Sequence, residues 1–375
     1  YRKDLAAHEE LLAATCKQEQ RERRAEMPDP AEILLFATGP RRRLWERRLT
    51  DPDAMLLRIG TGTLHSDVEL ALGKGGMWGE EDKPEQPELP DVPVCLPFQD
   101  LGVVGVAGDR ARALSTARWL TVQAAALHSP RDLSVVCLTS HTPAGADWSW
   151  LHWLPHTVPA QGQDCMALVA FDSETVARRV NELLGELNRR KAARENHNAL
   201  GNLYPDTSVL VVLDGARILR RMPGVPQLLT EGPRFGIYAL CLDEDERLLP
   251  EECSAVAAWT ADSPHHFRLR GHGLEEAGDV LGDQVTGDWC ELLARSLAPV
   301  RDVSRDDADS ALPTAARLLN LLEMPDPAGT DIERIWRAGG STTAAPIGIA
   351  ADGTFVLDIR RDGPHALVAG TTGAG

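Results

Sequence analysis

The stretch that decides the fold is LGVVGVAGDRARALSTARWLTVQAAALH, residues 101–128. Its first seven residues form a continuous apolar run, which is typical of a strand buried on both faces. The segment that follows, 109–128, carries Ala113, Leu120 and Ala124 at helical spacing. A buried strand that turns directly into a helix is the first half of a βαβ unit, so the stretch predicts a parallel sheet.

The same alternation continues toward the C-terminus. Further short runs rich in Val, Leu and Ile occur at 133–139, 166–171, 208–214 and 236–242. A long helical segment lies at about 173–196, and a final one near 285–297 closes the series. Short apolar strands separated by helices predict an α/β domain over residues 91–300, with a mostly parallel sheet covered by helices on both faces.

The composition changes on either side of this domain. Residues 1–27 alternate densely in charge and predict a solvated helix that ends before two prolines. Residues 73–94 are rich in Gly, Pro and acidic groups and predict a linker. We therefore expect a small α+β stalk at 1–90, the α/β domain at 91–300, a connector at 301–314 and the start of a second domain at 315–375. In that last part, 346–359 predicts a hairpin turning at Asp352-Gly353.

Three consecutive arginines, Arg41, Arg42 and Arg43, precede a predicted strand at 55–59. They have two interpretations. They could contact lipid headgroups or a neighbouring subunit. Alternatively, they form a solvated face whose charge is offset by nearby acidic residues, namely Glu46, Asp51 and Asp53.

Composition limits the classes of protein. The formal net charge of −17 argues against nonspecific nucleic-acid binding over the whole surface. The seven cysteines are scattered, without a C-x-x-C pair or zinc spacing, and are expected to be reduced thiols. No apolar run approaches the roughly 20 residues that span a bilayer. Because the chain begins without methionine and ends inside a glycine-rich motif, we expect it to be a piece of a longer protein, with a membrane anchor upstream of residue 1.

The C-terminal motif predicts a nucleotide site. An apolar strand, HALVA, runs into Gly370, Thr371, Thr372, Gly373, Ala374 and Gly375. These fit the first six positions of the phosphate-binding loop G-x-x-x-x-G-K-[ST], or Walker A motif, in which glycines let backbone N–H groups wrap phosphate. The lysine and the hydroxyl that holds magnesium would be the next two residues. As it stands, the loop lacks them and carries no catalytic residue.

A degenerate copy of this motif follows the first strand. Gly105, Gly108, Asp109, Arg110, Ala111 and Arg112 occupy the corresponding stretch. Arg110 stands where the last glycine belongs, Ala111 where the lysine belongs and Arg112 where the Ser/Thr belongs. A side chain at 110 would crowd the phosphate, and no ammonium is left for the β- and γ-phosphates. We therefore expect a nucleotide-binding fold that has lost hydrolysis.

Asp214 ends the strand VLVVLD, like the Walker B aspartate that helps to hold magnesium. Gly215 follows it, where a catalytic acid would often stand. An aspartate at a strand end is otherwise a turn former or helix cap. The remaining dense motif, DWSWLHWLPH at 147–156, is either a partner surface or a packed corner. His265 and His266 have no evident third ligand, so no metal site is expected.

These phrases together resemble one family. RLWERR-x-x-DPD, LHSPRDLSVVCL, DWSWLHWLPH, LPEEC and CELLARSLAPVRD are similar to the stalk and degenerate ATPase-like domain of EccC-type ATPases of type VII secretion systems. APIGIAADGTFVLDI followed by GPHALVAGTTGAG resembles the entry into their first FtsK/SpoIIIE-type motor domain. The resemblance covers nearly the whole chain and implies a P-loop NTPase (RecA-like) fold.

The resemblance also implies a function. The parent protein would be an ATP- and Mg-dependent motor ATPase at the cytoplasmic face of the bacterial inner membrane. It would associate with other type VII secretion subunits, form a ring, expected to be a hexamer, and drive export of small helical WXG-type proteins through its downstream domains. This chain would supply the stalk and a pseudo-ATPase domain, with no tightly bound cofactor and no nucleic-acid partner. The alternative is an FtsK/SpoIIIE-type DNA translocase, which salt-dependent DNA binding by the parent would support.

Overall fold

The computed structural model describes residues 2–40, 42–68, 70, 86–141, 146–160, 163–196, 207–271, 273–274, 277–302, 317–322, 324, 326–339, 342–350, 353–363 and 365. The chain forms two compact units, Tyr1–Val300 and Arg301–Gly375.

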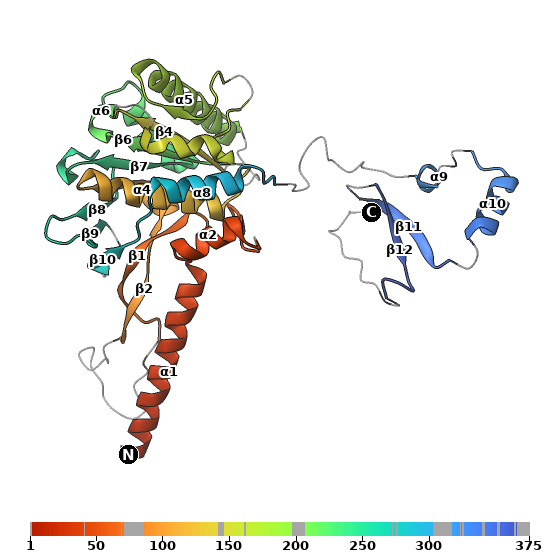
Figure 1. The fold of residues 1–375 in the computed structure, drawn as a ribbon, viewed down its shortest axis with the longest axis horizontal. Helices are drawn as coiled ribbons and strands as arrows, with labels where there is room; N and C mark the ends of the chain where they lie inside the picture. The colour runs from red at the N-terminus through yellow and green to blue at the C-terminus, as the bar shows by residue number, and fades with distance from the viewer. Residues whose placement is uncertain are drawn as a thin grey trace. The chain divides into compact units, whose positions relative to one another are not determined.

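The first unit is built on one ten-stranded sheet with the strand order β2-β1-β10-β9-β8-β3-β7-β6-β4-β5 (Figure 1). Its larger part is parallel and runs from β8 to β5. The parallel strands are β3 (Val103–Ala107), β4 (Leu133–Thr139), β5 (Val169–Ala170), β6 (Ser208–Asp214), β7 (Ile237–Asp243) and β8 (Ala255–Trp259). The predicted mostly parallel sheet is confirmed, although the run at 166–171 yields only the two residues of β5.

Four antiparallel strands extend the sheet beyond β8. They are β9 (His266–Gly271), β10 (Asp279–Gly282), β1 (Leu56–His65) and β2 (Glu88–Pro97). The expected boundary at residue 90 therefore falls inside a strand. The linker predicted at 73–94 is wrong for residues 88–94, because they pair with β1. Three prolines are tolerated in β2 because it is an edge strand, where a missing N–H costs no ladder hydrogen bond.

Helices cover both faces of the sheet, as predicted. One face carries α2 (Pro30–Thr38), α4 (Arg110–Leu127), α8 (Gly287–Leu297) and the 3₁₀ segments η2 (Ala146–Trp153) and η3 (Pro155–Thr157). The other carries α5 (Ser173–Asn196), α6 (Ala216–Leu219) and α7 (Val225–Glu231). Shorter pieces are α3 (Phe98–Leu101), η4 (Gly232–Phe235) and η5 (Glu246–Leu248).

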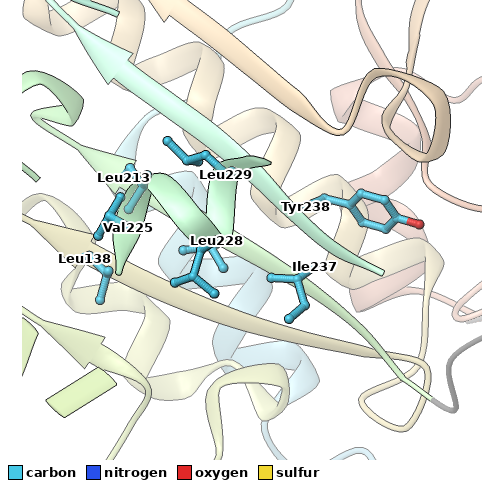
Figure 2. Close-up of a pocket in the computed structure, with 9 residues that line it drawn as sticks. Leu138, Leu213, Val225, Leu228, Leu229, Ile237 and Tyr238 are labelled. Atoms are coloured by element: carbon cyan, nitrogen blue, oxygen red, sulfur yellow. The ribbon is translucent and has the colours of Figure 1, made fainter. Parts of the chain in front are cut away.

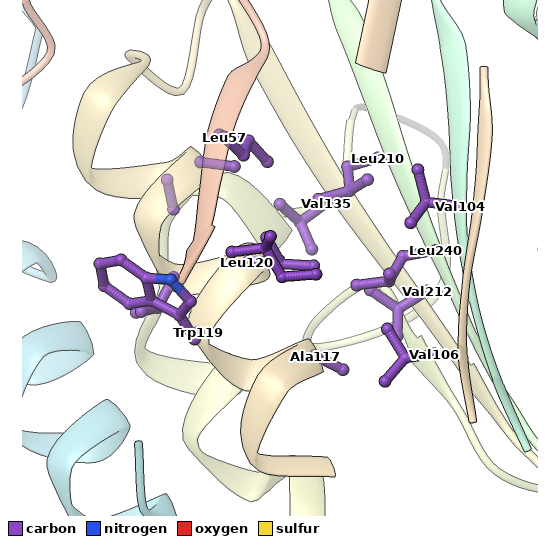
Figure 3. Close-up of a cluster of buried hydrophobic side chains, with 14 of the residues drawn as sticks. Leu57, Val104, Val106, Ala117, Trp119, Leu120, Val135, Leu210, Val212 and Leu240 are labelled. Carbon is purple, nitrogen blue, oxygen red and sulfur yellow. The ribbon is translucent and has the colours of Figure 1, made fainter. Parts of the chain in front are cut away.

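Alternation along the strands divides the apolar residues between two cores. In β6, Leu210 and Val212 join the core around α4, whereas Val211 and Leu213 join the core beneath α5 and α7. Figure 3 shows Ala117 and Leu120 of α4 turned toward this first set of strand residues. A parallel strand buried on both faces therefore needs the continuous apolar runs that the sequence contains.

The N-terminal helix α1 (Arg2–Glu26) runs beside β2 (Figure 1). Gln20 Nε2 donates to the Pro90 carbonyl at 2.6 Å, and Arg24 Nε donates to the Asp91 carbonyl at 2.8 Å. The next helix, α2, begins with a capping box in which Asp29 and Glu32 each accept from the other's backbone N–H. The helix predicted at 1–27 is confirmed; Pro28 follows its end, and Pro30 is the first residue of α2.

The second unit contains α9 (Leu318–Leu321), α10 (Gly329–Gly339), β11 (Ala344–Ala350) and β12 (Gly353–Asp358). The two strands pair antiparallel, with Ala350 opposite Gly353. The hairpin predicted at 346–359 is therefore confirmed in its strands. Asp352, in the predicted turn, lies outside the described residues.

Candidate functional site

The carboxyl ends of the parallel strands are where open α/β sheets bind ligands. Asp214 is the last residue of β6, and Ala107 is the last residue of β3. The strand β7 lies between them in the sheet. The degenerate Walker A-like stretch and the Walker B-like aspartate thus meet at one edge of the sheet.

The connection from β3 to α4 is too short to wrap a phosphate. Gly105 lies inside β3, in register with Cys241 on one side and Val256 on the other. Only Gly108 and Asp109 separate the strand from the first residue of α4. Glycine at 105 serves side-chain packing, since a Cβ there would lie 2.6 Å from Cδ1 of Leu249.

The N–H groups at the start of α4 are already occupied. The carboxylate of Asp109, the N-cap residue, accepts from the backbone N–H of Ala111 at 2.9 Å and from that of Arg112 at 3.4 Å. It is also paired with the Arg112 guanidinium, which helps to lower the pKa of Asp109. A phosphate at this helix end would need the same donors. The side chain of Asp109 therefore stands where an anionic ligand would bind.

Arg110 makes the central contact of the site, a bidentate ion pair with Asp214. Its Nη1 lies 2.5 Å from Oδ1 and its Nη2 lies 2.9 Å from Oδ2. The same Nη2 donates to Asp147 of η2 at 2.7 Å. Asp147 also accepts from Arg118 through its backbone carbonyl at 2.8 Å. A guanidinium thus lies against the carboxylate that, in a Walker B motif, would help to hold magnesium.

Asp214 has no remaining capacity for a metal ion. Its side chain is fully buried, and Oδ2 also accepts from Oγ1 of Thr139 and Nε1 of Trp148, both at 2.9 Å. Burial acts to raise its pKa, but the hydrogen bonds from Arg110 and Trp148 and the charge of Arg110 outweigh burial. The pKa of Asp214 is therefore below its ordinary value, and the carboxylate is held ionised by protein donors.

Position 215 has no room for a catalytic acid. Gly215 has φ +85°, and a Cβ there would collide with Oγ of Ser140. Its N–H donates to the Leu242 carbonyl at 3.1 Å. Glycine is required because of both the left-handed backbone and the close approach of Ser140. The sequence shows only that glycine replaces the catalytic acid at position 215. The structure adds that packing against Ser140 leaves no room for a larger side chain there.

The tryptophan-rich motif forms a packed corner that reaches the site. Trp148 and Trp150 are buried, and Trp148 is the side chain that donates to Asp214. Trp153 remains 43% exposed, with the Arg295 guanidinium of α8 3.9 Å from its ring centroid. Sequence reasoning treats this motif as separate from the nucleotide-like site. The acidic residue beside the tryptophans, Asp147, is the signal that could have linked them.

The LPEEC segment, residues 249–253, lies between η5 and β8. It contacts both β3 and the residue that follows α6. Leu249 and Cys253 fill the space over Gly105. Glu251 and Glu252 pair with Arg220, which follows α6, at 2.5 and 2.9 Å. Because α6 comes directly after Gly215, the segment contacts both the middle of β3 and the chain that follows the end of β6. We call residues 249–253 the strap.

Within the basic run after α2, the last arginine, Arg43, is paired within the protein, as is the nearby Arg47. Arg43 binds Glu46 and the Ala25 carbonyl, each at 2.7 Å. Arg47 is buried and pairs with Asp53 at 2.8 Å. These contacts favour the interpretation in which acidic residues offset the charge. Arg41 lies outside the described residues.

Neither the small pocket beneath α7 nor the histidine pair at 265–266 contributes a site. The pocket between α7 and the sheet, shown in Figure 2, has a volume of about 10 Å³ and an apolar lining, so it holds at most a water-sized group. Within the described ranges, no three metal-ligating side chains gather, which includes the surroundings of His265 and His266. None of the described helices is long and apolar enough to cross a membrane. The predicted loop at Gly370–Gly375 lies outside the described residues.

Several known proteins resemble this chain along most of its length. The ESX secretion system protein EccC of Thermomonospora curvata is 26% identical, with 93% of this chain and 27% of that protein covered. The ESX-4 secretion system protein EccC4 of Mycobacterium tuberculosis is 25% identical, with 93% and 25% covered. No protein-family model matches. The chain spans about a quarter of the length of these curated relatives.

A solved structure of the cytoplasmic domain of the Thermomonospora curvata type VII secretion ATPase EccC also matches. It has a TM-score of 0.45 and 16% sequence identity, and the match covers 83% of this chain and 37% of that one. A second match is a structure of the same organism's EccC, comprising ATPases 2 and 3 in complex with a signal-sequence peptide. Its TM-score is 0.42 and its identity 15%, with 83% of this chain and 57% of that one covered.

Proposed function

We propose that this chain, a relative of the EccC proteins of ESX secretion systems, is the part of a type VII secretion motor that carries a non-hydrolysing ATPase-like domain. In this proposal residues 91–300 supply a fixed structural module, and residues 1–90 complete its sheet. ATP and magnesium act at domains beyond it, for which Gly370–Gly375 would begin the first phosphate loop.

The observation that carries the proposal is the ion pair of Arg110 with Asp214. In a hydrolysing P-loop enzyme the Walker B aspartate supports a magnesium ion that bridges the β- and γ-phosphates. Here a guanidinium occupies that place, and Oδ2 has two further donors, from Thr139 and Trp148. Magnesium would have to displace a charge-assisted bidentate pair, which is among the strongest side-chain contacts.

A second observation supports the loss of nucleotide binding. The two-residue connection from β3 to α4 offers no series of free N–H groups, since Asp109 caps the helix. The position of the P-loop lysine is Ala111. Each of these features alone would weaken phosphate binding, and together they remove the phosphate contacts that the fold normally supplies.

The activity of the whole protein follows as part of the same proposal. It would assemble with other secretion-system subunits at the cytoplasmic face of the membrane and form a ring. It would drive export of small helical WXG-type proteins. In one related protein, ATPases 2 and 3 were solved in complex with a signal-sequence peptide. Substrate contacts are therefore proposed for downstream domains rather than for residues 91–300.

Calorimetric titration of Mg-ATP into the chain tests the non-hydrolysing site. We expect no measurable heat of binding at millimolar ATP, because both the cation site and the phosphate donors are occupied by side chains. Intrinsic tryptophan fluorescence in the same buffer would verify that the protein is folded. Micromolar binding that disappears in Asp214→Ala would show instead that Arg110 moves aside for nucleotide, and the proposal would then be wrong.

A further inference from the structure

Two thiols lie where the end of the strap packs on the sheet, on the face that carries α5 and α7. Cys241 belongs to β7 and is fully buried, whereas Cys253 is partly exposed at the end of the strap. Cys253 packs against the core cluster to which Cys241 belongs. Neither cysteine belongs to the nucleotide-like motifs of the sequence, and the proposed function uses neither.

Gly105 leaves room for the Cys253 side chain beside Cys241. It is the register partner of Cys241 in the neighbouring strand β3, so the two residues stand side by side on one face. A Cβ at position 105 would lie 3.2 Å from Sγ of Cys253. The side chain of Cys253 therefore occupies the space that any other residue at 105 would fill. That placement puts its sulfur on the face of the sheet that carries Cys241, the residue beside Gly105 in the next strand.

We propose that Cys241 and Cys253 form a redox-sensitive pair that closes to an intramolecular disulfide when a peroxide reaches Cys253. The pair is a modification site with a small oxidant, such as hydrogen peroxide, as its co-reactant. Transient disulfides of this kind occur in compartments that keep structural cysteines reduced.

The oxidation proceeds in two balanced steps. The sulfur of Cys253 attacks hydrogen peroxide, its O–O bond breaks, and the products are a sulfenic acid and one water. The sulfur of Cys241 then attacks Sγ of Cys253, the S–O bond breaks, and hydroxide leaves with the proton of the Cys241 thiol as a second water. The two electrons that the thiols lose reduce the peroxide.

The environment assigns different roles to the two sulfurs. The hydrogen bond with Cys253 and complete burial raise the pKa of Cys241 well above its ordinary value. Cys241 therefore stays protonated and unreactive toward oxidants in bulk solvent. Cys253 is the sulfur with solvent access, so it is the first to react and Cys241 resolves the intermediate.

The bond would fix the strap to the sheet. It would close a short loop from Cys241 to Cys253 that contains η5. It would also restrict the motion of Glu251 and Glu252. These carboxylates hold Arg220, which follows α6 and the Asp214 strand end. Oxidation would thus restrain the chain that follows the end of β6 without touching Asp214 itself.

The experiment treats the full chain with hydrogen peroxide at neutral pH and then blocks free thiols under denaturing conditions. Non-reducing digestion and mass spectrometry should identify one linked peptide pair joining Cys241 to Cys253, two hydrogens lighter than the reduced peptides. The thermal midpoint should rise by a few degrees on oxidation and return on reduction. Both Cys241→Ser and Cys253→Ser should lose the linked pair and the shift.

Cys165 provides the matched control. It is also partly exposed and packs against the same core, but its sulfur lies 2.9 Å from Nη1 of Arg179. Cys165→Ser should leave the linked peptides unchanged. If oxidation gives sulfinic acid at Cys253 without a link, or joins Cys253 to another cysteine, the proposal is overturned. Since peptide mapping of the unsubstituted chain decides this, a serine variant that fails to fold leaves the test intact.

Discussion

At the scale of single residues, the site depends on the charge balance of one buried carboxylate. Asp214 is fully buried and takes its cation from Arg110, whose side chain is 33% exposed. Breaking a buried ion pair from one side leaves an uncompensated charge, which costs more than the pair itself contributes. The two members of the pair should therefore respond unequally to substitution.

Arg110→Ala should lower the free energy of unfolding by about 2–4 kcal/mol, less than for a completely buried pair because Arg110 reaches solvent. Adding Asp214→Asn should recover part of this loss, since the buried group is then neutral. Urea unfolding of the single and double variants measures both effects. Arg178→Ala, which breaks an exposed pair with Glu174, is the control and should cost less than about 1 kcal/mol. Equal losses in Arg110→Ala and Arg178→Ala would contradict this explanation.

Two buried histidines make stability depend on pH. Burial lowers the pKa of His128 and of His156 to about 4. His128 Nε2 accepts from the Met55 N–H at 3.2 Å, and His156 Nε2 donates to the His128 carbonyl at 2.8 Å. Both rings are therefore neutral in the folded protein, whereas in the unfolded chain they take up protons near pH 6.5.

Stability should accordingly be complete above pH 7 and fall as the pH drops from about 6.5 toward 4, because only the unfolded state binds the two protons. Each ring can account for up to roughly 3 kcal/mol over that range. Urea unfolding between pH 7.5 and 5 measures the slope above the range in which carboxylates titrate. His156→Gln should reduce the slope, while His152→Gln, at an exposed position, should not. An unchanged slope in His156→Gln would rule out this origin.

At this scale the sequence predicts which residues match or depart from the ATPase motifs, but not which side chains contact one another. Arg110, Ala111 and Gly215 stand out as departures from the ATPase pattern and Asp214 as a match to it, which needs only motif spacing. The pairing of Arg110 with Asp214 is not predictable, because it depends on the crossover that places β3 two strands away from β6. Likewise, the donors Thr139 and Trp148 come from segments that no local pattern connects to Asp214.

At the scale of elements, the connection between β3 and α4 sets the geometry of the site. Gly108 has φ +139°, a conformation that side chains other than glycine rarely adopt. A Cβ there would lie 2.5 Å from Cβ of Trp259 in β8. The short connection is thus built around one glycine and one capping aspartate.

Gly108→Ala should destabilise the protein by about 2–4 kcal/mol through backbone strain and the clash with Trp259. Gly185, in the middle of α5, is the matched control, because nothing lies within 4 Å of the position that its Cβ would occupy. Gly185→Ala should stabilise the protein by about 0.5–1 kcal/mol, the difference in helix propensity. Thermal unfolding of both variants measures the contrast, and a neutral Gly108→Ala would contradict it.

Strands that are buried on both faces are predicted well from the sequence, and several strands of the antiparallel part are not. The strands β3, β4, β6 and β7 are buried on both faces and so carry continuous apolar runs. In contrast, β2 contains three prolines, and its pattern resembles a linker until its pairing with β1 is known. The same holds for β9 and β10, whose half-exposed residues give no distinctive run.

At the scale of the whole molecule, residues before 98 are part of the domain's sheet and core. The core around α4 includes Ile33, Met55, Leu57 and Ile59. Trp45 donates to the Ala125 carbonyl at 3.1 Å, which fastens the RLWERR motif to the end of α4. The expected division into stalk and ATPase-like domain therefore does not correspond to two separate compact units.

A chain that begins at Phe98 should fail to fold, because it loses β1 and β2 and exposes the edge of β10. A chain that begins at Gln18 should keep the full unfolding transition, since the described side chains in the first half of α1 are largely exposed. Far-UV circular dichroism and size-exclusion chromatography distinguish a cooperative monomer from an aggregate. A soluble, cooperatively folding chain from Phe98 onward would show that the antiparallel strands are dispensable.

The ion pair of Arg110 and Asp214 also limits how such a domain could be re-engineered. A tethered guanidinium faces its carboxylate at an effective concentration that free magnesium at cellular levels does not approach. If the proposed function holds, changes in the cellular ATP level would therefore leave this domain unchanged. The substitution Ala111→Lys alone would not make the domain respond to ATP. The arginine would have to be removed and the connection after β3 lengthened in the same step.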